Sequence, residues 1–172
     1  ELGYDKSLWQ QIATELGWPS VHIPEAYGGL GLGYVDLVVL METMGEALLC
    51  SPFFSTIALG ANTLLAVASE TQKQELLPAI AEGRMTATLA LTEKSGRWDA
   101  SEIEATARPE GDGFVLDGVK TWISNGGIAD FYCVFARNDA APGGSKGISG
   151  FLVPAGTPGL DASERIEVMS PH

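Results

Sequence analysis

Residues 118–126, Gly118-Val119-Lys120-Thr121-Trp122-Ile123-Ser124-Asn125-Gly126, decide how this chain is interpreted. A short apolar run, 114–116, comes just before them and leads into a turn at Asp117-Gly118. The pattern predicts that the strand continues through Trp122 and Ile123 and stops at the glycines that follow. Trp122 and Ser124 are two residues apart, so a strand would place them on one face. A planar ligand on that face would meet an aromatic ring and a hydrogen-bond donor together.

From about Thr86 onward, polar and apolar residues alternate with the period of a β-strand. The alternating or apolar runs are 86–92, 103–108, 114–116, 131–136 and 148–153. A glycine-containing turn at 110–113 predicts a hairpin between the second and third of them. Strands at this spacing, without helices between them, predict an antiparallel β-barrel or sandwich in residues 86–172.

Residues 1–85 show helical patterns instead. The segment 36–49 is apolar nearly all round, which predicts a helix that is buried on most faces. Ser51-Pro52 predicts the start of another helix, which runs to about Ala68. Ser69 with Gln72 resembles a capping box, so a further helix is expected to begin there. The predicted fold class is therefore α+β, with an N-terminal all-α helical domain (1–85) followed by a middle β domain (86–172).

Composition excludes several classes of protein. The chain has 172 residues, of which 45% are hydrophobic, and this argues against disorder. Its net charge of −12 weighs against a nucleic-acid partner. No apolar run is long enough to predict a membrane span. Cys50 and Cys133 lie in apolar surroundings and are expected to be buried and reduced, which suits a cytoplasmic protein. With two histidines in the chain, no metal site is expected.

Several stretches together resemble the acyl-CoA dehydrogenases. They are Leu16-Gly17-Trp18, the segment 24–31, Gly45-Glu46, Leu91-Thr92-Glu93 and the segment 118–126. Their order and spacing are more specific than any one of them. The resemblance implies the N-terminal helical and middle β domains of a FAD-dependent oxidoreductase. The chain begins without methionine and ends at Ser170-Pro171-His172, so we expect a fragment that lacks the family's C-terminal helical domain.

The resemblance also implies which residues contact FAD. The strand that ends in Thr-Glu lines the flavin in this family, and this role carries over to Leu89, Leu91 and Thr92. Trp122 would pack on the flavin, with Ile123 beside it. Ser124 would place its hydroxyl near the flavin N5, where this family usually has threonine. A donor at this position would stabilise charge as the flavin accepts hydride.

One stretch departs from the family pattern. After Thr-Glu the family usually has proline and then a small-residue run that ends in Gly-Ser-Asp, whereas this chain has Lys94-Ser95-Gly96-Arg97-Trp98-Asp99. Arg97 is expected to contact the FAD pyrophosphate in place of backbone donors. Trp98 is expected to narrow the substrate channel or to stack on the acyl group. The alternative is a rearranged surface loop.

The activity implied by the resemblance is α,β-dehydrogenation of an acyl-CoA substrate in fatty acid metabolism. Electrons would pass to an electron-transfer flavoprotein, and the enzyme would be a homo- or hetero-oligomer. The family takes its catalytic base from the C-terminal domain, so no catalytic residue is assigned within 1–172, and Glu93 is expected to be structural. Two alternatives stay open: a non-catalytic subunit of a heteromeric dehydrogenase, or an acyl-CoA oxidase or flavin monooxygenase on the same scaffold.

Overall fold

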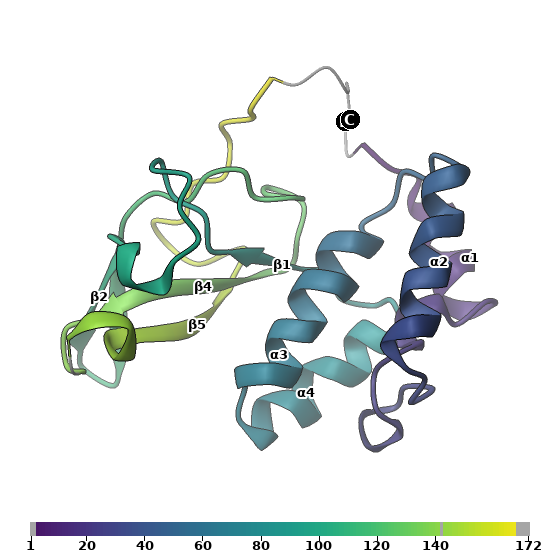
Figure 1. Cartoon of the computed structure of the whole chain (residues 1–172), viewed down its shortest axis with the longest axis horizontal. Coiled ribbons are helices and arrows are strands. Elements are labelled where there is room, and N and C mark those ends of the chain that lie inside the picture. Colours follow the sequence, from purple (N-terminus) through teal and green to yellow (C-terminus); the bar gives the residue numbers. More distant parts are fainter. Residues whose placement is uncertain (1–2, 142, 168–172) are drawn as a thin grey trace.

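The computed structural model describes residues 3–141 and 143–167. Helices occupy the first half of the chain and strands the second (Figure 1), so the α+β class is confirmed. The helices are α1 (Lys6–Thr14), α2 (Tyr34–Glu46), the π-helix η3 (Phe54–Ala61), α3 (Asn62–Val67) and α4 (Glu70–Ala81). The strands are β1 (Ala87–Ala90), β2 (Thr106–Glu110), β3 (Gly113–Asp117), β4 (Phe131–Asn138) and β5 (Ile148–Pro154). Over the described ranges, no helix combines the length and apolarity needed to cross a membrane.

Side-chain caps fix the starts of two helices. The Asp5 carboxylate accepts hydrogen bonds from the backbone N–H groups of Ser7 and Leu8, at 2.7 and 3.2 Å, and so begins α1. The predicted capping box at α4 is confirmed, because Ser69 and Gln72 each bond the other's backbone N–H. These bonds satisfy N–H groups that have no partner within the helix itself.

Helix α2 is far more exposed than its apolar sequence predicts. Only Leu37 and Met44 are buried, whereas Val35, Val38 and Val39 are 77%, 61% and 56% exposed. The expectation of a helix buried on most faces was therefore wrong for the described part of the chain. The reason is that α2 contacts the rest of the molecule through a single stripe of its surface, which contains Leu37 and Met44.

The helix predicted from Ser51-Pro52 is present, but its first part is a π-helix, η3, that continues into α3. This segment packs directly on β1. The hydroxyl of Thr56 accepts a hydrogen bond from the backbone N–H of Ala87 at 3.2 Å. A Cβ added to Gly60 would lie 2.5 Å from Cβ of Ala87, so only glycine allows this close approach. The contact joins the helices to the start of the sheet.

The sheet is mixed rather than antiparallel, which corrects the sequence-based prediction. The order is β1-β4-β2-β3, with β5 on the other edge of β4. β2–β3 and β4–β5 are antiparallel, whereas β1 and β2 both run parallel to β4. Parallel pairing needs long crossover connections, and the chain supplies them: residues 91–130 lie between β1 and β4, and residues 111–130 lie between β2 and β4. The predicted hairpin turn between β2 and β3 is confirmed.

One hydrophobic core joins the helices to the sheet. It includes Trp9 of α1, Ile57 of η3, Ile80 of α4, Ala87 of β1 and Phe131 of β4, all at most 5% exposed. The last helix ends at Ala81 and the first strand begins at Ala87. The division into domains 1–85 and 86–172 stays a prediction, since the two halves share this core.

Candidate functional site

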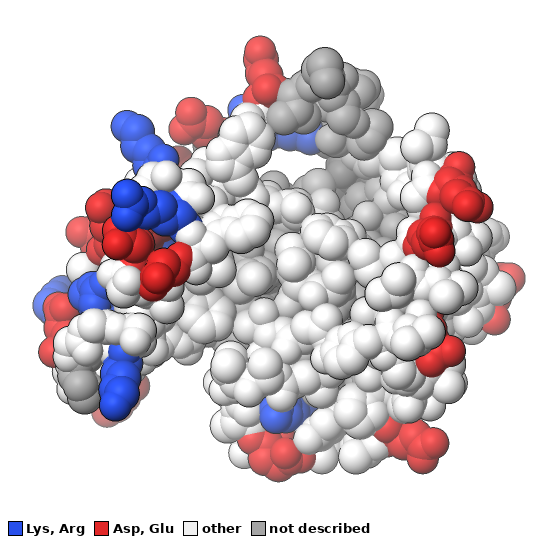
Figure 2. Space-filling model, viewed as in Figure 1, with Lys and Arg blue, Asp and Glu red and all other residues white. Residues whose placement is uncertain are grey.

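A large groove of about 2160 Å³ lies where the helices meet the sheet. Its walls come from the end of α2 with the segment that follows it, from β3, β4 and β5, and from the loop 118–126. Figure 2 shows this hollow between the two parts of the molecule, with walls that are largely uncharged. Typical small-molecule pockets occupy roughly 300–1,000 Å³. The groove therefore has room for an extended ligand.

The loop 118–126 crosses this groove, but it is not a strand. Strand β3 ends at Asp117, and Trp122 adopts a left-handed backbone with φ 57°. Gly118, at φ 153°, packs so closely on Ala105 that an added Cβ would lie 2.5 Å from Cβ of that residue. The chain is therefore diverted at Gly118, and the prediction of a strand through Trp122 and Ile123 was wrong. Trp122, Ile123 and Ser124 still line the groove, and Trp122 is 65% exposed.

Residues with an unfavourable backbone conformation line the groove. Within 3–141 and 143–167, three residues other than glycine have positive φ: Leu48 (49°), Trp122 (57°) and Asn125 (59°). All three line the groove. Asparagine tolerates this conformation, but it is an outlier for the bulky Leu48 and Trp122 and persists there only where the surroundings enforce it. Such strain gathers at ligand-binding sites, so its location supports a functional groove.

Hydrogen bonds hold the loop at both of its ends. The backbone N–H of Thr121 donates to the carbonyl of Thr92 at 2.9 Å. The hydroxyl of Thr88 donates to the carbonyl of Ser124 at 2.6 Å, and the amide of Asn125 donates to the hydroxyl of Ser55 at 2.5 Å. These bonds connect the loop to β1, to the segment after β1 and to η3. Trp122 and Ile123 lie between the fastened ends.

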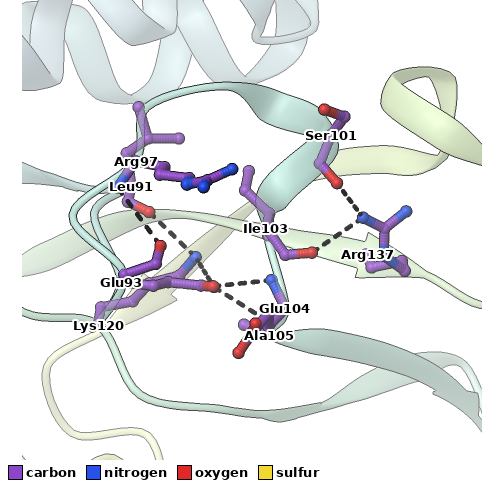
Figure 3. Close-up of polar contacts among 10 residues, drawn as sticks. Leu91, Glu93, Arg97, Ser101, Ile103, Glu104, Ala105, Lys120 and Arg137 are labelled. Carbon is purple, nitrogen blue, oxygen red and sulfur yellow. Dashed lines mark hydrogen bonds and ion pairs between the residues drawn. The ribbon is translucent and has the colours of Figure 1, made fainter.

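A buried ion pair lies beside the loop (Figure 3). The ammonium of Lys120 donates to Oε1 of Glu93 at 2.7 Å, and the two side chains are only 10% and 9% exposed. Glu93 also accepts from the backbone N–H groups of Glu104 (2.7 Å) and Ala105 (2.9 Å). Burial by itself would raise the pKa of Glu93, but the bonds from Lys120 and the two backbone groups outweigh it and lower that pKa. Glu93 is therefore held ionised by three donors.

Only some of the predicted flavin-contact residues line this groove, and contact with flavin stays a prediction for all of them. Trp122, Ile123 and Ser124 line the groove, whereas the side chains of Leu89, Leu91 and Thr92 do not. Leu91 and Thr92 instead lie beside the loop, with their carbonyls accepting from Lys120 and Thr121 at 3.3 and 2.9 Å. Leu89 packs against the common core.

The unusual pair Arg97 and Trp98 lies away from the groove lining. Arg97 forms an exposed ion pair with Glu102 at 3.3 Å. Trp98 is 77% exposed. This placement matches the alternative interpretation of a rearranged surface loop, and the assignments of Arg97 to FAD and Trp98 to substrate stay predictions. Sequence reasoning assigned no role to Lys120, Thr88 or Ser55, which hold the loop in place. Lys120 lies inside the opening motif, but its burial has no sequence signal.

The two cysteines differ in environment. Cys133 in β4 is buried, and burial raises the pKa of its thiol to about 11. Cys50 is exposed and lines the groove, so the expectation that it is buried was wrong. We expect iodoacetamide at pH 8 to alkylate Cys50 within minutes and to leave Cys133 unmodified, because the thiolate is the reactive form. Peptide mass spectrometry would check this, and equal labelling of both cysteines in folded protein would contradict the burial of Cys133.

Comparison with known proteins identifies the scaffold. Residues 1–84 match the family model of the acyl-CoA dehydrogenase N-terminal domain, and residues 88–171 match that of the acyl-CoA dehydrogenase middle domain. The chain belongs to the acyl-CoA dehydrogenase family. The chain is 33% identical over 165 residues to mitochondrial isovaleryl-CoA dehydrogenase of Pongo abelii, covering 94% of this chain and 39% of that protein.

Solved structures agree with this assignment. Butyryl-CoA dehydrogenase from Megasphaera elsdenii superposes with a TM-score of 0.75 at 32% identity, covering 91% of this chain and 42% of that one. The prolyl acyl carrier protein oxidase AnaB superposes with a TM-score of 0.79 at 27% identity, covering 95% of this chain and 44% of that one. This member of the acyl-CoA dehydrogenase family thus spans about two fifths of the length of the proteins it matches.

Proposed function

We propose that the groove binds FAD and that the full-length protein is a flavin-dependent oxidoreductase that dehydrogenates an acyl-CoA thioester. The observation that carries this proposal is the strained loop 122–125, which places an exposed indole and the hydroxyl-bearing Ser124 in the lining of a largely apolar groove. An isoalloxazine ring is planar and apolar on its faces, with polar atoms at its edge. The residues present therefore fit the ring of this cofactor.

The roles of the loop residues follow from their chemistry. Trp122 would cover one face of the flavin, since its indole is 65% exposed in the groove. The hydroxyl of Ser124 would donate a hydrogen bond to the edge of the ring. When bound, FAD would accept the hydride that leaves the β-carbon of the acyl group. A donor at this edge contributes most where negative charge develops during the reaction.

Neither part of the ion pair is proposed as the catalytic base. Glu93 is already bonded to three donors, and its lowered pKa makes it a weak proton acceptor. We assign no base within residues 1–172. The volume of the groove leaves space for a thioester beside the flavin. Electron-transfer flavoprotein is the proposed electron acceptor, and an oligomer is the proposed state of the enzyme.

A direct test uses the full-length protein after purification. We expect a yellow protein with one flavin per chain, or a flavin-free protein that takes up added FAD to that ratio. Anaerobic mixing with acyl-CoA thioesters of several chain lengths is expected to bleach the flavin absorption with at least one of them. A protein that binds no FAD would contradict the proposal, as would bound FAD that no thioester reduces.

A second candidate function follows from the similarity to the acyl carrier protein oxidase. In that case the reduced flavin would react with oxygen rather than with electron-transfer flavoprotein, and the acyl group would arrive on a carrier protein. Admitting air to the bleached protein separates the two functions. Reoxidation within seconds favours an oxidase, whereas reoxidation over many minutes favours a dehydrogenase.

A further inference from the structure

We propose that Glu93 and Lys120 are positioning residues: their ion pair fixes the backbone of residues 120–124, so that Trp122 and Ser124 face the groove in one orientation. The inference rests on the proposed function and adds to it two residues that act through the main chain. Lys120 borders the groove, but its ammonium is bonded to Oε1 of Glu93 at 2.7 Å.

Glu93 is the point at which three separate segments meet (Figure 3). It belongs to the segment that follows β1, it accepts hydrogen bonds from the backbone of Glu104 and Ala105, and it pairs with Lys120. The ammonium of Lys120 returns to the first segment through the carbonyl of Leu91, at 3.3 Å. Ala105 also packs under Gly118, where the loop begins. The carboxylate therefore connects the segment after β1, the backbone at 104–105 and the start of the loop.

The loop depends on such contacts because its backbone is strained. Trp122 has a left-handed conformation that bulky residues avoid, so surrounding bonds must hold it. The far end of the loop is held by Thr88 and Ser55. The near end has one backbone bond, from Thr121 to Thr92, besides the ion pair. Loss of the ion pair would leave the near end weakly held. The indole of Trp122 would then no longer be fixed in one orientation.

Burial makes the ion pair hard to replace. Both side chains are at most 10% exposed, so solvent cannot take over the lost bonds. In a Lys120→Met variant the Glu93 carboxylate would keep its two backbone donors but lose its counter-charge. The carbonyl of Leu91 would lose a donor as well. An isosteric Glu93→Gln variant would keep the shape and remove the charge. One variant thus removes the positive charge of the ion pair and the other removes the negative charge.

The test combines two measurements on flavin-free, full-length protein. Amide hydrogen exchange follows the loop, and titration with FAD gives the dissociation constant and the absorption spectrum of the bound flavin. We expect Lys120→Met and Glu93→Gln to speed exchange at Thr121 at least tenfold, to weaken FAD binding at least tenfold and to shift the flavin spectrum. Amides of α1 and α4 should exchange as in the wild type. Lys146→Met, which removes an exposed lysine outside the groove lining, should change neither measurement.

The outcomes are separable. Folded variants that bind FAD within twofold of the wild type and leave exchange at Thr121 unchanged would overturn the positioning role. If the variants do not fold, exchange in the wild type decides, because the inference requires slow exchange at Thr121, Glu104 and Ala105. Rapid exchange there would overturn it. A wild-type protein that binds no FAD would instead overturn the proposed function, while the exchange measurement would still test the ion pair.

Discussion

Replacing Glu93 with alanine is expected to lower the free energy of unfolding by about 3–5 kcal/mol, because it leaves Lys120 as a buried charge without a partner. The variant also removes the acceptor for the backbone N–H groups of Glu104 and Ala105. Unpaired buried donors carry a further cost. Denaturant unfolding followed by circular dichroism would measure the change.

The matched control is Glu110→Ala, which breaks the ion pair between Arg108 and Glu110. Those side chains are 58% and 60% exposed, so the expected change is about 0–1 kcal/mol. Equal effects of the two variants would contradict a buried pair at Glu93.

The effect of Glu93→Ala should also depend on pH. The folded-state pKa of Glu93 lies below its unfolded value, so its contribution to stability is fully present above the unfolded pKa. That contribution is lost as pH falls through the folded pKa. We therefore expect the difference in unfolding free energy between wild type and variant to be largest near neutrality and to shrink on the acidic side of about pH 4. A difference that grows on acidification would contradict the lowered pKa.

Replacing Trp122 with alanine is expected to raise the dissociation constant for FAD about 5- to 150-fold. Stacking of a planar heterocycle on an aromatic side chain contributes about 1–3 kcal/mol, and each 1.4 kcal/mol corresponds to a tenfold change in affinity. Alanine keeps the Cβ that makes the left-handed backbone costly, but the indole that it removes is 65% exposed, so the variant should remain folded. Quenching of flavin fluorescence during titration of the full-length protein would measure the affinity.

Trp98→Ala is the matched control for this prediction. It removes a second tryptophan, which is 77% exposed and lies outside the groove lining. We expect its affinity for FAD to stay within about twofold of the wild type. If Trp98→Ala weakened binding as much as Trp122→Ala, the flavin would lie against the loop 94–102 rather than in the groove.

Local patterns predicted the elements well because they depend on neighbouring residues. Ser69 marks the start of α4 through a bond to the backbone of Gln72, three residues away, so sequence alone suffices for it. The pairing of β1 and β2 with β4 depends on where long connections return, which no local pattern contains. The exposure of α2 is a similar case. An apolar sequence indicates that the surface of a helix is suited to burial. It does not indicate which face of the helix packs against the rest of the chain.

The candidate site was predicted in part, for related reasons. Family resemblance identified Trp122 and Ser124, which line the groove. The prediction that they lie in a strand was wrong. The close contact between Gly118 and Ala105 turns the chain away from the strand direction, and this tertiary contact outweighs the β-propensity of the loop. Lys120 had no recognisable signal, since a lysine in a turn is usually solvated. Only its position beside Glu93 in the folded chain shows that it is buried.

The central claim is that the loop 118–126 forms the flavin site, and a crystal structure of the full-length protein with FAD would test it most directly. We expect the isoalloxazine ring in the groove, in van der Waals contact with the indole of Trp122 and within hydrogen-bond distance of the Ser124 hydroxyl. Glu93 and Lys120 should remain paired beneath it. A flavin bound elsewhere, with Trp122 still facing solvent, would contradict the account.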